Sequence, residues 1–412
     1  MHFKDFAKSG NPKTLFSAFF YFDISFMVWV VLGPLGNSIA EEFGLSASQK
    51  GLMTGLPILS GSLLRLVLGP LADRIGGRNT ALLGLTLTFI PLLLGGLVTS
   101  SYEMVLLVGL LLGIAGASFA VALPLASRWY PPEQQGLVLG IAGAGNSGTV
   151  LASLFAPRLA ALFGGWQPVL LLAAIPVAAA WLIVAFLAKD APGKPRAKSL
   201  SEYKEVLRQP DTLWFSLLYS VTFGGFVGLA TFLPIFFHDQ YGLDKIDAGN
   251  FAALCVFAGS FVRPIGGYLA DRFGGLRILV VLFGLIGSLA LLIGGLQPLA
   301  VETVLLFAMM TLLGSGNGSV FQIVPQRFPK EIGLVTGIVG AVGGIGGFLL
   351  PNLLGNLKDI TGTYASGFMV YTIAAFACVA LILIVRGSWQ RSWAGKGGRA
   401  RTLATPAAQS TP

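Results

Sequence analysis

Twelve apolar runs of about 20 residues or more divide this chain almost from end to end. They lie at residues 14–40, 51–71, 80–98, 104–127, 136–163, 167–188, 212–237, 248–270, 277–296, 302–325, 333–357 and 366–386. A helix needs about 20 predominantly apolar residues to cross the hydrocarbon core of a bilayer. Only 11% of the residues are charged, against about 25% in an average soluble domain. We therefore predict an all-α integral membrane protein with twelve transmembrane helices.

The lysines and arginines are distributed unevenly over the segments between these runs. Of the 27, 21 fall in segments or at run ends on the same side as the amino terminus, four fall on the opposite side in the same way, and Arg65 and Arg263 lie deep inside runs. Cytoplasmic loops carry the excess of Lys and Arg, so both termini are predicted to be cytoplasmic. The excess of Lys and Arg in the cytoplasmic segments of a protein that spans a lipid bilayer also explains the net charge of +9. No nucleic-acid partner is needed to explain it.

An internal repeat divides the chain into two halves. The segment Arg65-Leu-Val-Leu-Gly-Pro-Leu-Ala-Asp73-Arg74-Ile-Gly-Gly recurs 198 residues later as Arg263-Pro-Ile-Gly-Gly-Tyr-Leu-Ala-Asp271-Arg272-Phe-Gly-Gly. Two parallel six-helix halves with a site between them near the bilayer midplane are typical of a transporter. The predicted parts are an amino-terminal half at 1–188, a cytoplasmic linker at 189–211, a carboxy-terminal half at 212–387 and a disordered cytoplasmic tail at 388–412. The linker is predicted to be either a short interfacial helix or a solvated segment.

The residues that usually carry out catalysis or bind metals are scarce. Cys255 and Cys378 each lie in an apolar run far from any second cysteine or histidine, and His2 and His238 lie outside the runs. The sequence therefore offers no disulfide framework and no zinc site. We expect no metal, no cofactor and no enzymatic activity.

The loop after the second run, Gly69-Pro-Leu-Ala-Asp73-Arg74-Ile-Gly-Gly-Arg78, resembles the signature loop of the major facilitator superfamily, and residues 267–275 are its second copy. In that superfamily the acidic and basic residues of the loop brace the inner ends of the helices and bias which side is open. The resemblance implies the major facilitator fold and a gating role for Asp73, Arg74, Asp271 and Arg272.

Four features inside the runs are similar to the nitrate/nitrite porter family of this superfamily. They are Arg65, Arg263, the segment Gly140-Ile-Ala-Gly-Ala-Gly-Asn146-Ser-Gly and the segment Gly337-Ile-Val-Gly-Ala-Val-Gly-Gly-Ile-Gly-Gly-Phe348. The segment at 314–322 adds to this resemblance, which covers nearly the whole chain. It implies transport of nitrate and/or nitrite by alternating access in the cell inner (plasma) membrane, and we expect a monomer.

The two arginines inside the runs indicate an anion. A charged side chain in the middle of a span costs at least about 2.5 kcal/mol, so Arg65 and Arg263 need a reason to be there. A guanidinium group stays charged and presents a planar fork of N–H donors, which suits planar nitrate or bent nitrite. The alternative is that each arginine pairs with a carboxylate or caps helix carbonyls, but Asp23 is the one acidic residue deep in any run, and it cannot neutralise both.

Aromatic residues are candidates for the rest of the site, because nitrate is flat, polarisable and poorly hydrated. Phe26 lies in the first run, and Tyr219 and Phe223 are four residues apart and therefore share a helix face. The resemblance implies that Phe119, Tyr219, Phe223 and Phe321 contact the substrate and that Asn146 donates from its amide. With 30 phenylalanines in the chain, packing is the alternative for each ring.

Asp23 is the candidate for proton coupling. If it faces the central cavity, Arg65 and Arg263 hold its carboxylate ionised in the empty site. A bound nitrate cancels part of their positive field and favours protonation of Asp23, and by reciprocity the proton favours nitrate. Proton-coupled nitrate symport is therefore the leading hypothesis. A nitrate/nitrite exchanger with Asp23 as a permanent counter-ion is the first alternative, and an organic-anion permease of the same superfamily is the second.

Overall fold

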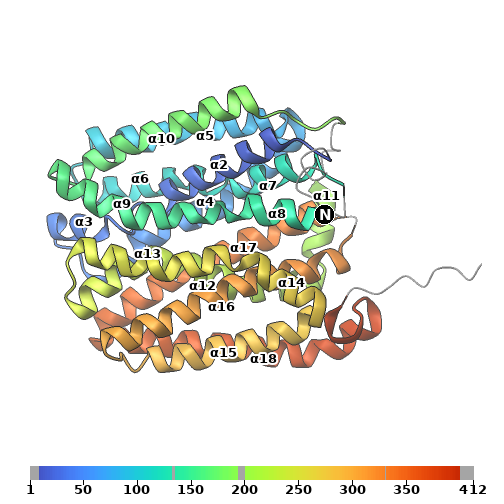
Figure 1. The fold of residues 1–412 in the computed structure, drawn as a ribbon. Helices are drawn as coiled ribbons and strands as arrows, with labels where there is room; N and C mark the ends of the chain where they lie inside the picture. The colour runs from blue at the N-terminus through green and yellow to red at the C-terminus, as the bar shows by residue number, and fades with distance from the viewer. Residues whose placement is uncertain (1–8, 132–134, 194–199, 330, 400–412) are drawn as a thin grey trace, which may run out of the picture.

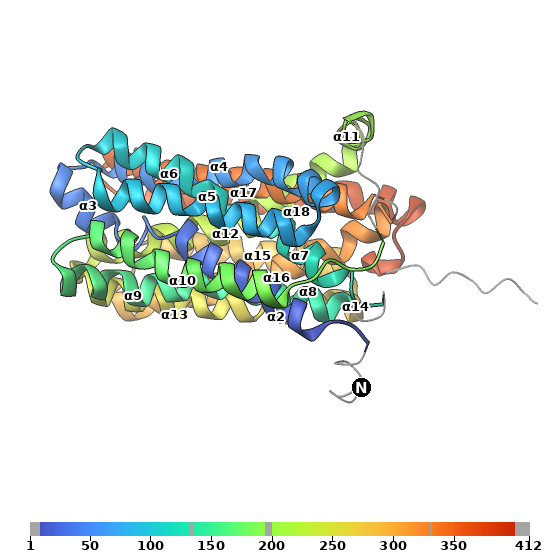
Figure 2. The same ribbon diagram turned by 90° about the horizontal axis from the view of Figure 1, so that it is seen from above.

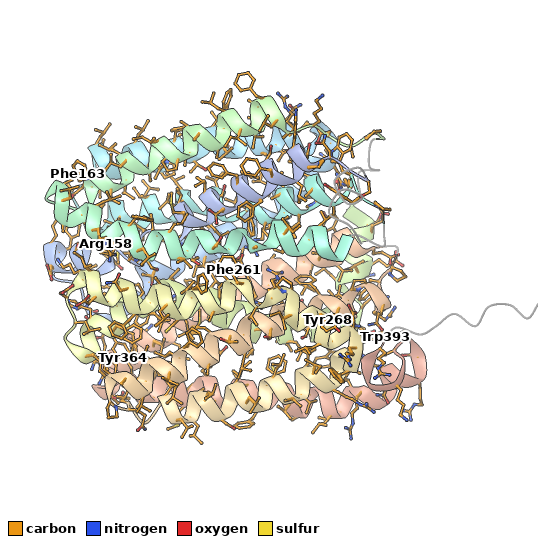
Figure 3. All side chains as sticks on the ribbon, in the orientation of Figure 1. Arg158, Phe163, Phe261, Tyr268, Tyr364 and Trp393 are labelled. Carbon is orange, nitrogen blue, oxygen red and sulfur yellow. The ribbon has the colours of Figure 1, made fainter. Side chains whose placement is uncertain are left out.

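The computed structural model describes residues 9–131, 135–193, 200–329 and 331–399 as an all-helical bundle (Figure 1). Eleven helical segments of this part are long and apolar enough to cross a membrane. Many large apolar side chains are exposed on its flanks, Phe261 among them (Figure 3). This surface suits contact with lipid tails.

The amino-terminal half contains two groups of helices. The long or paired helices are α2 (Pro12–Trp29), α4 (Ala47–Ile75), α5 (Gly77–Leu97), α6 (Tyr102–Gly116) with α7 (Phe119–Ser127), α8 (Gln135–Gly143) with α9 (Gly148–Phe163), and α10 (Gln167–Leu187). Short elements are α3 (Gly36–Phe43) and the 3₁₀ turn η2 (Ala144–Ser147), which lies between α8 and α9. Helix α2, which carries Lys13 and Asp23, is not among the eleven candidate spans.

The carboxy-terminal half repeats this arrangement. It contains α12 (Pro210–Tyr241), α13 (Lys245–Phe261) with α14 (Arg263–Phe273), α15 (Gly275–Ile293), α16 (Leu299–Arg327), α17 (Ile332–Thr361), α18 (Ala365–Ser392) and the 3₁₀ turn η3 (Lys396–Gly398). The short helix α11 (Leu200–Leu207) precedes it. The halves pack together mainly through α4 against α17 and α9 against α13.

The bundle has two distinct ends (Figures 1 and 2). Helix α3 lies at one, which we call the α3 end, and α11 lies at the other, the α11 end. Helix α2 begins and helix α18 finishes at the α11 end. The two ends of the described chain therefore lie on the same side of the bundle.

Several apolar runs are interrupted where the sequence suggested one continuous helix. The run at 14–40 divides into α2 and α3, and three other runs are divided inside the bundle, at residues 117–118, at η2 and at Val262. Proline at the second position of α14 lacks the N–H that a continuous helix needs there. At η2, Gly148 lies against the backbone of Asp23, so the chain passes where a side chain would not fit.

The sequence predicted a disordered tail at residues 388–412. Up to Arg399 the structure shows ordered elements instead. Helix α18 continues to Ser392 and η3 follows it. The indole Nε1 of Trp389 donates to Asp211 Oδ1 at 2.7 Å, and its ring centroid lies 5.1 Å from that of Phe215. These contacts fix the helix end on α12. Residues 400–412 lie outside the described residues.

Candidate functional site

Two arginines, one from each half, lie against the same aromatic ring at the centre of the bundle. Arg65 projects from the middle of α4 and Arg263 from the first position of α14. Their guanidinium carbons lie 5.0 and 5.7 Å from the ring centroid of Phe119. The structure thus brings together two residues that are 198 positions apart in the sequence.

The Arg65 guanidinium is buried, with 1% of the residue exposed. Its Nε donates to the Gly116 carbonyl at 3.2 Å, and its Nη1 donates across the two halves to the Gly340 carbonyl at 2.9 Å. Its Nη2 is buried without a hydrogen-bond partner among the described residues. No carboxylate in this part of the chain forms an ion pair with Arg65, so its charge lacks a counter-ion.

Arg263 has a similar unused donor. Its Nη2 lies 3.4 Å from the Tyr219 hydroxyl oxygen, to which it donates, while its buried Nη1 has no partner in the described ranges. The Tyr219 ring is parallel to that of Phe223, with centroids 5.0 Å apart, and meets the edge of Phe321 at 4.8 Å. Tyr219 therefore connects Arg263 to the rings of Phe223 and Phe321.

Aromatic rings surround the two charges. Arg65 lies 5.1 Å from the Phe223 centroid and 5.3 Å from the Trp29 ring, and Arg263 lies 5.8 Å from that of Phe321. These distances are within the range of cation–π attraction. The rings also exclude water, and this strengthens the electrostatic interactions of the two guanidinium groups.

Phe26, a candidate from the first run, lies one ring further back. Its centroid is 4.8 Å from that of Trp29 and 4.6 Å from that of Phe22. Phe22 in turn lies 5.7 Å from Phe119. Phe26 therefore supports the rings that border the arginines.

Interrupted helices carry three of the candidate residues. Phe119 and Arg263 are the first residues of α7 and α14, and Asn146 lies in η2. Transporters commonly form midplane sites from discontinuous helices. The interruptions that the hydrophobic pattern did not show therefore occur where the candidate site is formed.

Asn146 lies in the η2 turn, and Asp23 on α2 contacts the same turn. Asn146 is 1% exposed, and its Oδ1 has no hydrogen-bond partner within the described ranges. Asp23 Oδ1 accepts from Ser147 Oγ at 2.6 Å. No ion pair joins Asp23 to Arg65 or Arg263 in the described part of the chain. The structure thus places the Asp23 carboxylate against Ser147 of η2.

The candidate gating residues lie at the α11 end. Arg128 Nη2 forms an ion pair with Asp73 at 2.5 Å, beside a cavity of about 450 Å³. Arg74, Asp271 and Arg272 are exposed, and the Arg272 guanidinium lies 5.4 Å from the Phe273 ring centroid. The two copies of the loop therefore have different contacts.

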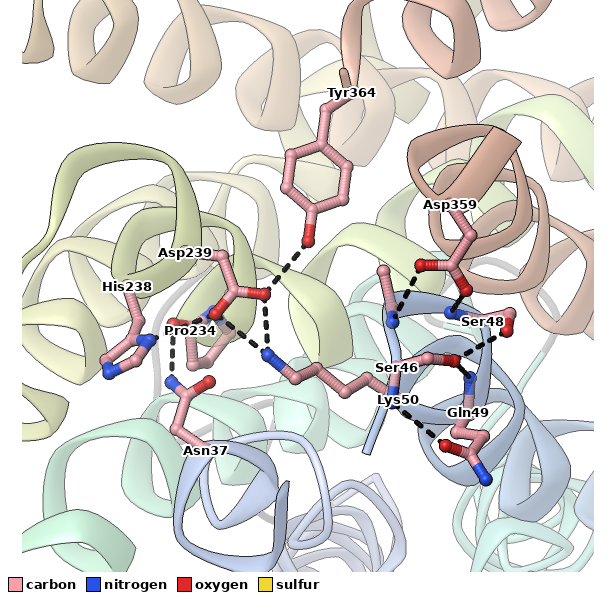
Figure 4. Close-up of polar contacts among 11 residues, drawn as sticks. Asn37, Ser46, Ser48, Gln49, Lys50, Pro234, His238, Asp239, Asp359 and Tyr364 are labelled. Carbon is pink, nitrogen blue, oxygen red and sulfur yellow. Dashed lines mark hydrogen bonds and ion pairs between the residues drawn. The ribbon is translucent and has the colours of Figure 1, made fainter. Parts of the chain in front are cut away.

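Polar contacts described between the two halves gather at the α3 end (Figure 4). Lys50 Nζ from α4 lies 2.9 and 2.7 Å from the two carboxylate oxygens of Asp239 on α12. The Asp359 carboxylate on α17 accepts from the backbone N–H groups of Ala47 and Ser48 at 3.1 and 2.8 Å. We call these five residues the α3-end clamp. It holds the amino end of α4 against the carboxy-terminal half.

Tyr364 supports this clamp from the start of α18. Its hydroxyl donates to Asp239 Oδ2 at 3.1 Å. Burial and the neighbouring Asp239 carboxylate raise the pKa of Tyr364 well above its ordinary value, so the hydroxyl remains a donor at any physiological pH. His238 Nδ1 lies 3.0 Å from Asp239 Oδ1.

Sequence reasoning missed several groups near the arginines. Trp29 faces Arg65, and its Nε1 donates to the Pro57 carbonyl at 2.6 Å. Its position three residues after Phe26, on the same helix face, was the available signal. The sequence offers no such signal for the carbonyls of Gly116 and Gly340, because every residue has a backbone carbonyl.

The comparisons with known proteins agree with this architecture. A model of the Major Facilitator Superfamily matches residues 15–351. The chain is 34% identical to a nitrite extrusion protein of Bacillus subtilis, over 89% of this chain and 91% of that protein. It is 35% identical to a probable nitrate/nitrite transporter of Mycobacterium tuberculosis, over 92% and 97% of the two chains. It is also 35% identical to a probable nitrate/nitrite antiporter of Thermus thermophilus, over 88% and 89%.

Among solved structures, the fold is similar to that of a bacterial homologue of the human lysosomal transporter Spinster, in an inward-facing and occupied conformation. The TM-score is 0.66 at 18% identity, over 92% of this chain and 97% of that one. This likeness concerns the fold. Together with the family match and the relatives, it shows that the chain is a multi-pass membrane protein of the Major Facilitator Superfamily and belongs to its nitrate/nitrite porter family.

Proposed function

We propose that this protein transports nitrate and nitrite across the cell membrane, and that the anion binds between Arg65 and Arg263. One observation carries the proposal: each guanidinium has a buried nitrogen without a partner in the described part of the chain, and both groups lie on the Phe119 ring. Two buried like charges repel one another. A bound anion would relieve this repulsion and use both free donors.

The surroundings favour a small, weakly hydrated anion. Four aromatic rings lie within 6 Å of the guanidinium carbons. An anion that keeps a tight hydration shell would lose more on entering such a site than nitrate does. The names of the relatives, which include a nitrite extrusion protein and a probable nitrate/nitrite transporter, support the same substrates.

The proposed topology has twelve spans, with α2 as the first and the α11 end in the cytoplasm. The excess of Lys and Arg at the α11 end supports this orientation. The two six-helix halves at 1–188 and 212–387 are then joined by a cytoplasmic linker. The chain is proposed to act as a monomer, because each half supplies one arginine and the site needs no second copy.

Alternating access is proposed to proceed by rocking of the two halves about the anion. In the described conformation the α3-end clamp joins them at the end that is proposed to be external. Arg65 donates to Gly340 of the opposite half, so an anion on Arg65 and Arg263 would bridge both halves. Asp73 with Arg128, together with Arg74, Asp271 and Arg272, is proposed to gate the cytoplasmic side.

The energy coupling has two candidate modes. In proton symport, Asp23 would take up the proton, and the hydrogen bond from Ser147 would link it to η2, where Asn146 lies. The unpaired charges of Arg65 and Arg263 favour the second mode, nitrate/nitrite exchange. An empty carrier would have to change conformation with both charges uncompensated, whereas a carrier with a bound anion would not. An organic-anion permease fits less well, since aromatic rings, and not the polar lining such a substrate needs, surround the two guanidinium carbons.

Uptake of labelled nitrate into proteoliposomes that contain the purified protein tests the proposed function. We expect uptake above that of empty liposomes, competition by unlabelled nitrite, and little competition by chloride or a bulky organic anion. Liposomes that take up no nitrate with either a proton gradient or internal nitrite would contradict the proposal.

A further inference from the structure

One asparagine in the carboxy-terminal half is as buried as a core residue but lacks the hydrogen bonds that a buried polar side chain usually forms. Asn317 lies in the middle of α16 and is 1% exposed. Its Oδ1 is buried without a hydrogen-bond partner among the described residues, and its amide nitrogen, Nδ2, donates to no acceptor in the same part of the chain. Burial of an amide without compensating hydrogen bonds is unfavourable, so the N–H donors of Nδ2 are available to an acceptor outside the protein chain.

Its neighbours on α16 show which way Asn317 faces. Gly318 packs against the backbone of Arg263 on α14, and Gly316 packs against Thr222 on α12. Successive residues of a helix are about 100° apart. Asn317 therefore faces the space between α12 and α14, where Tyr219 and Arg263 meet.

Phe321 independently places this face at the site. It follows Asn317 by four residues and so lies on the same face, one turn away. Its ring centroid is 5.8 Å from the Arg263 guanidinium carbon and 4.8 Å from the Tyr219 ring. The amide is thus one helical turn from a ring that borders the arginines.

Packing alone does not explain this residue. On α16 itself, Ser315 and Ser319 donate to carbonyls one turn earlier, at 3.0 Å each. On α17, the amide of Asn352 likewise donates to the Phe348 carbonyl at 2.7 Å. These side chains show how a buried polar group is satisfied by its own helix, and Asn317 does not use that arrangement.

We propose that Asn317 is a further substrate-contacting residue, and that its amide N–H₂ donates to an oxygen of the anion bound between Arg65 and Arg263. The proposal rests on the proposed function, because it needs an anion at that site. It gives the carboxy-terminal half an amide donor to accompany Asn146 of the amino-terminal half. A neutral amide favours an anion with several acceptor oxygens over a spherical halide.

The test compares Asn317→Leu with Ser319→Ala in detergent-purified protein. Leucine has a similar volume and no donors, whereas Ser319→Ala removes a satisfied hydroxyl from the same helix. For each variant, Tm is measured without ligand and the nitrate Kd is measured by titration. We expect Asn317→Leu to weaken nitrate binding at least tenfold without lowering Tm, and Ser319→Ala to leave the Kd within twofold of wild type.

A lower Tm with an unchanged Kd in Asn317→Leu would show a packing residue and overturn the proposal. If the leucine variant fails to fold, Asn317→Ser provides the second measurement, and an unchanged Kd there would also overturn it. Failure of the wild-type protein itself to bind nitrate would count against the proposed function, which distinguishes the two claims.

Discussion

Removal of the Lys50 ammonium group should open the α3 end. Lys50 and Asp239 form the one ion pair of the α3-end clamp, and their side chains are 13% and 17% exposed. In Lys50→Met the Asp239 carboxylate keeps His238 and Tyr364, which belong to its own half. The variant therefore removes the link between the halves and leaves the rest of the cluster.

The size of the effect follows from this geometry. A hydrogen bond to a charged group contributes about 1.5–3 kcal/mol when buried, and an exposed ion pair contributes about 0–1 kcal/mol. This partly exposed pair should contribute about 1–2 kcal/mol to the closed state. Its loss should raise the ratio of open to closed molecules by a factor of about 5–30.

Spin labels on either side of the α3 end can measure this ratio. Leu162 on α9 and Ile360 on α17 are 75% and 78% exposed, and the native Cys255 and Cys378 are buried. Pulsed electron–electron distances in the double-cysteine protein should show a longer-distance population that grows in Lys50→Met. Lys245→Met is the matched control, because its ion pair with Glu41 also joins the halves but is more exposed.

An unchanged distance distribution in Lys50→Met would refute this reasoning. So would an equally large change in Lys245→Met, since exposure would then not determine the contribution of a pair. The remaining contacts of Asp359 with Ala47 and Ser48 explain why we expect a shift of population and not complete opening.

Three further predictions concern the site. Asp23→Asn should abolish uptake driven by a pH gradient and preserve nitrate/nitrite exchange in proteoliposomes; wild-type uptake that ignores an imposed pH gradient would exclude symport. Asn146→Ala should weaken nitrate binding by about tenfold, the equivalent of one hydrogen bond to a charged group, in a thermal-shift titration; an unchanged affinity would make Asn146 a packing residue. Phe119→Leu removes the ring shared by both guanidinium groups and should weaken nitrate binding by about tenfold or more, whereas Phe26→Leu, one ring further back, should have a smaller effect on the same titration.

The sequence was sufficient for the architecture and for the charged part of the candidate site. Membrane spans follow from long apolar runs, and the repeat that relates Arg65 to Arg263 is visible without coordinates. The meeting of both on Phe119 is consistent with that prediction. These features depend on residue type and spacing, which the sequence states directly.

Other features depend on tertiary contacts and could not be read from the pattern. The helix interruptions at η2 and Val262 fall inside runs that are long and apolar overall, so the hydropathy pattern does not reveal them, although Pro264 was a local signal for the second. The partner of Asp23 is Ser147, 124 residues away. The ordered end of α18 depends on Trp389 meeting Asp211, although the local composition of the tail suggested disorder.

Transport by Arg65→Lys and Arg263→Lys tests the central claim most directly. Lysine keeps the positive charge but lacks the planar fork of donors that would hold a flat anion between the two halves. Nitrate uptake is measured in proteoliposomes with equal amounts of each inserted, folded variant. We expect each variant to lose most of the wild-type uptake, and near-normal uptake by either variant would contradict binding of the anion by both arginines.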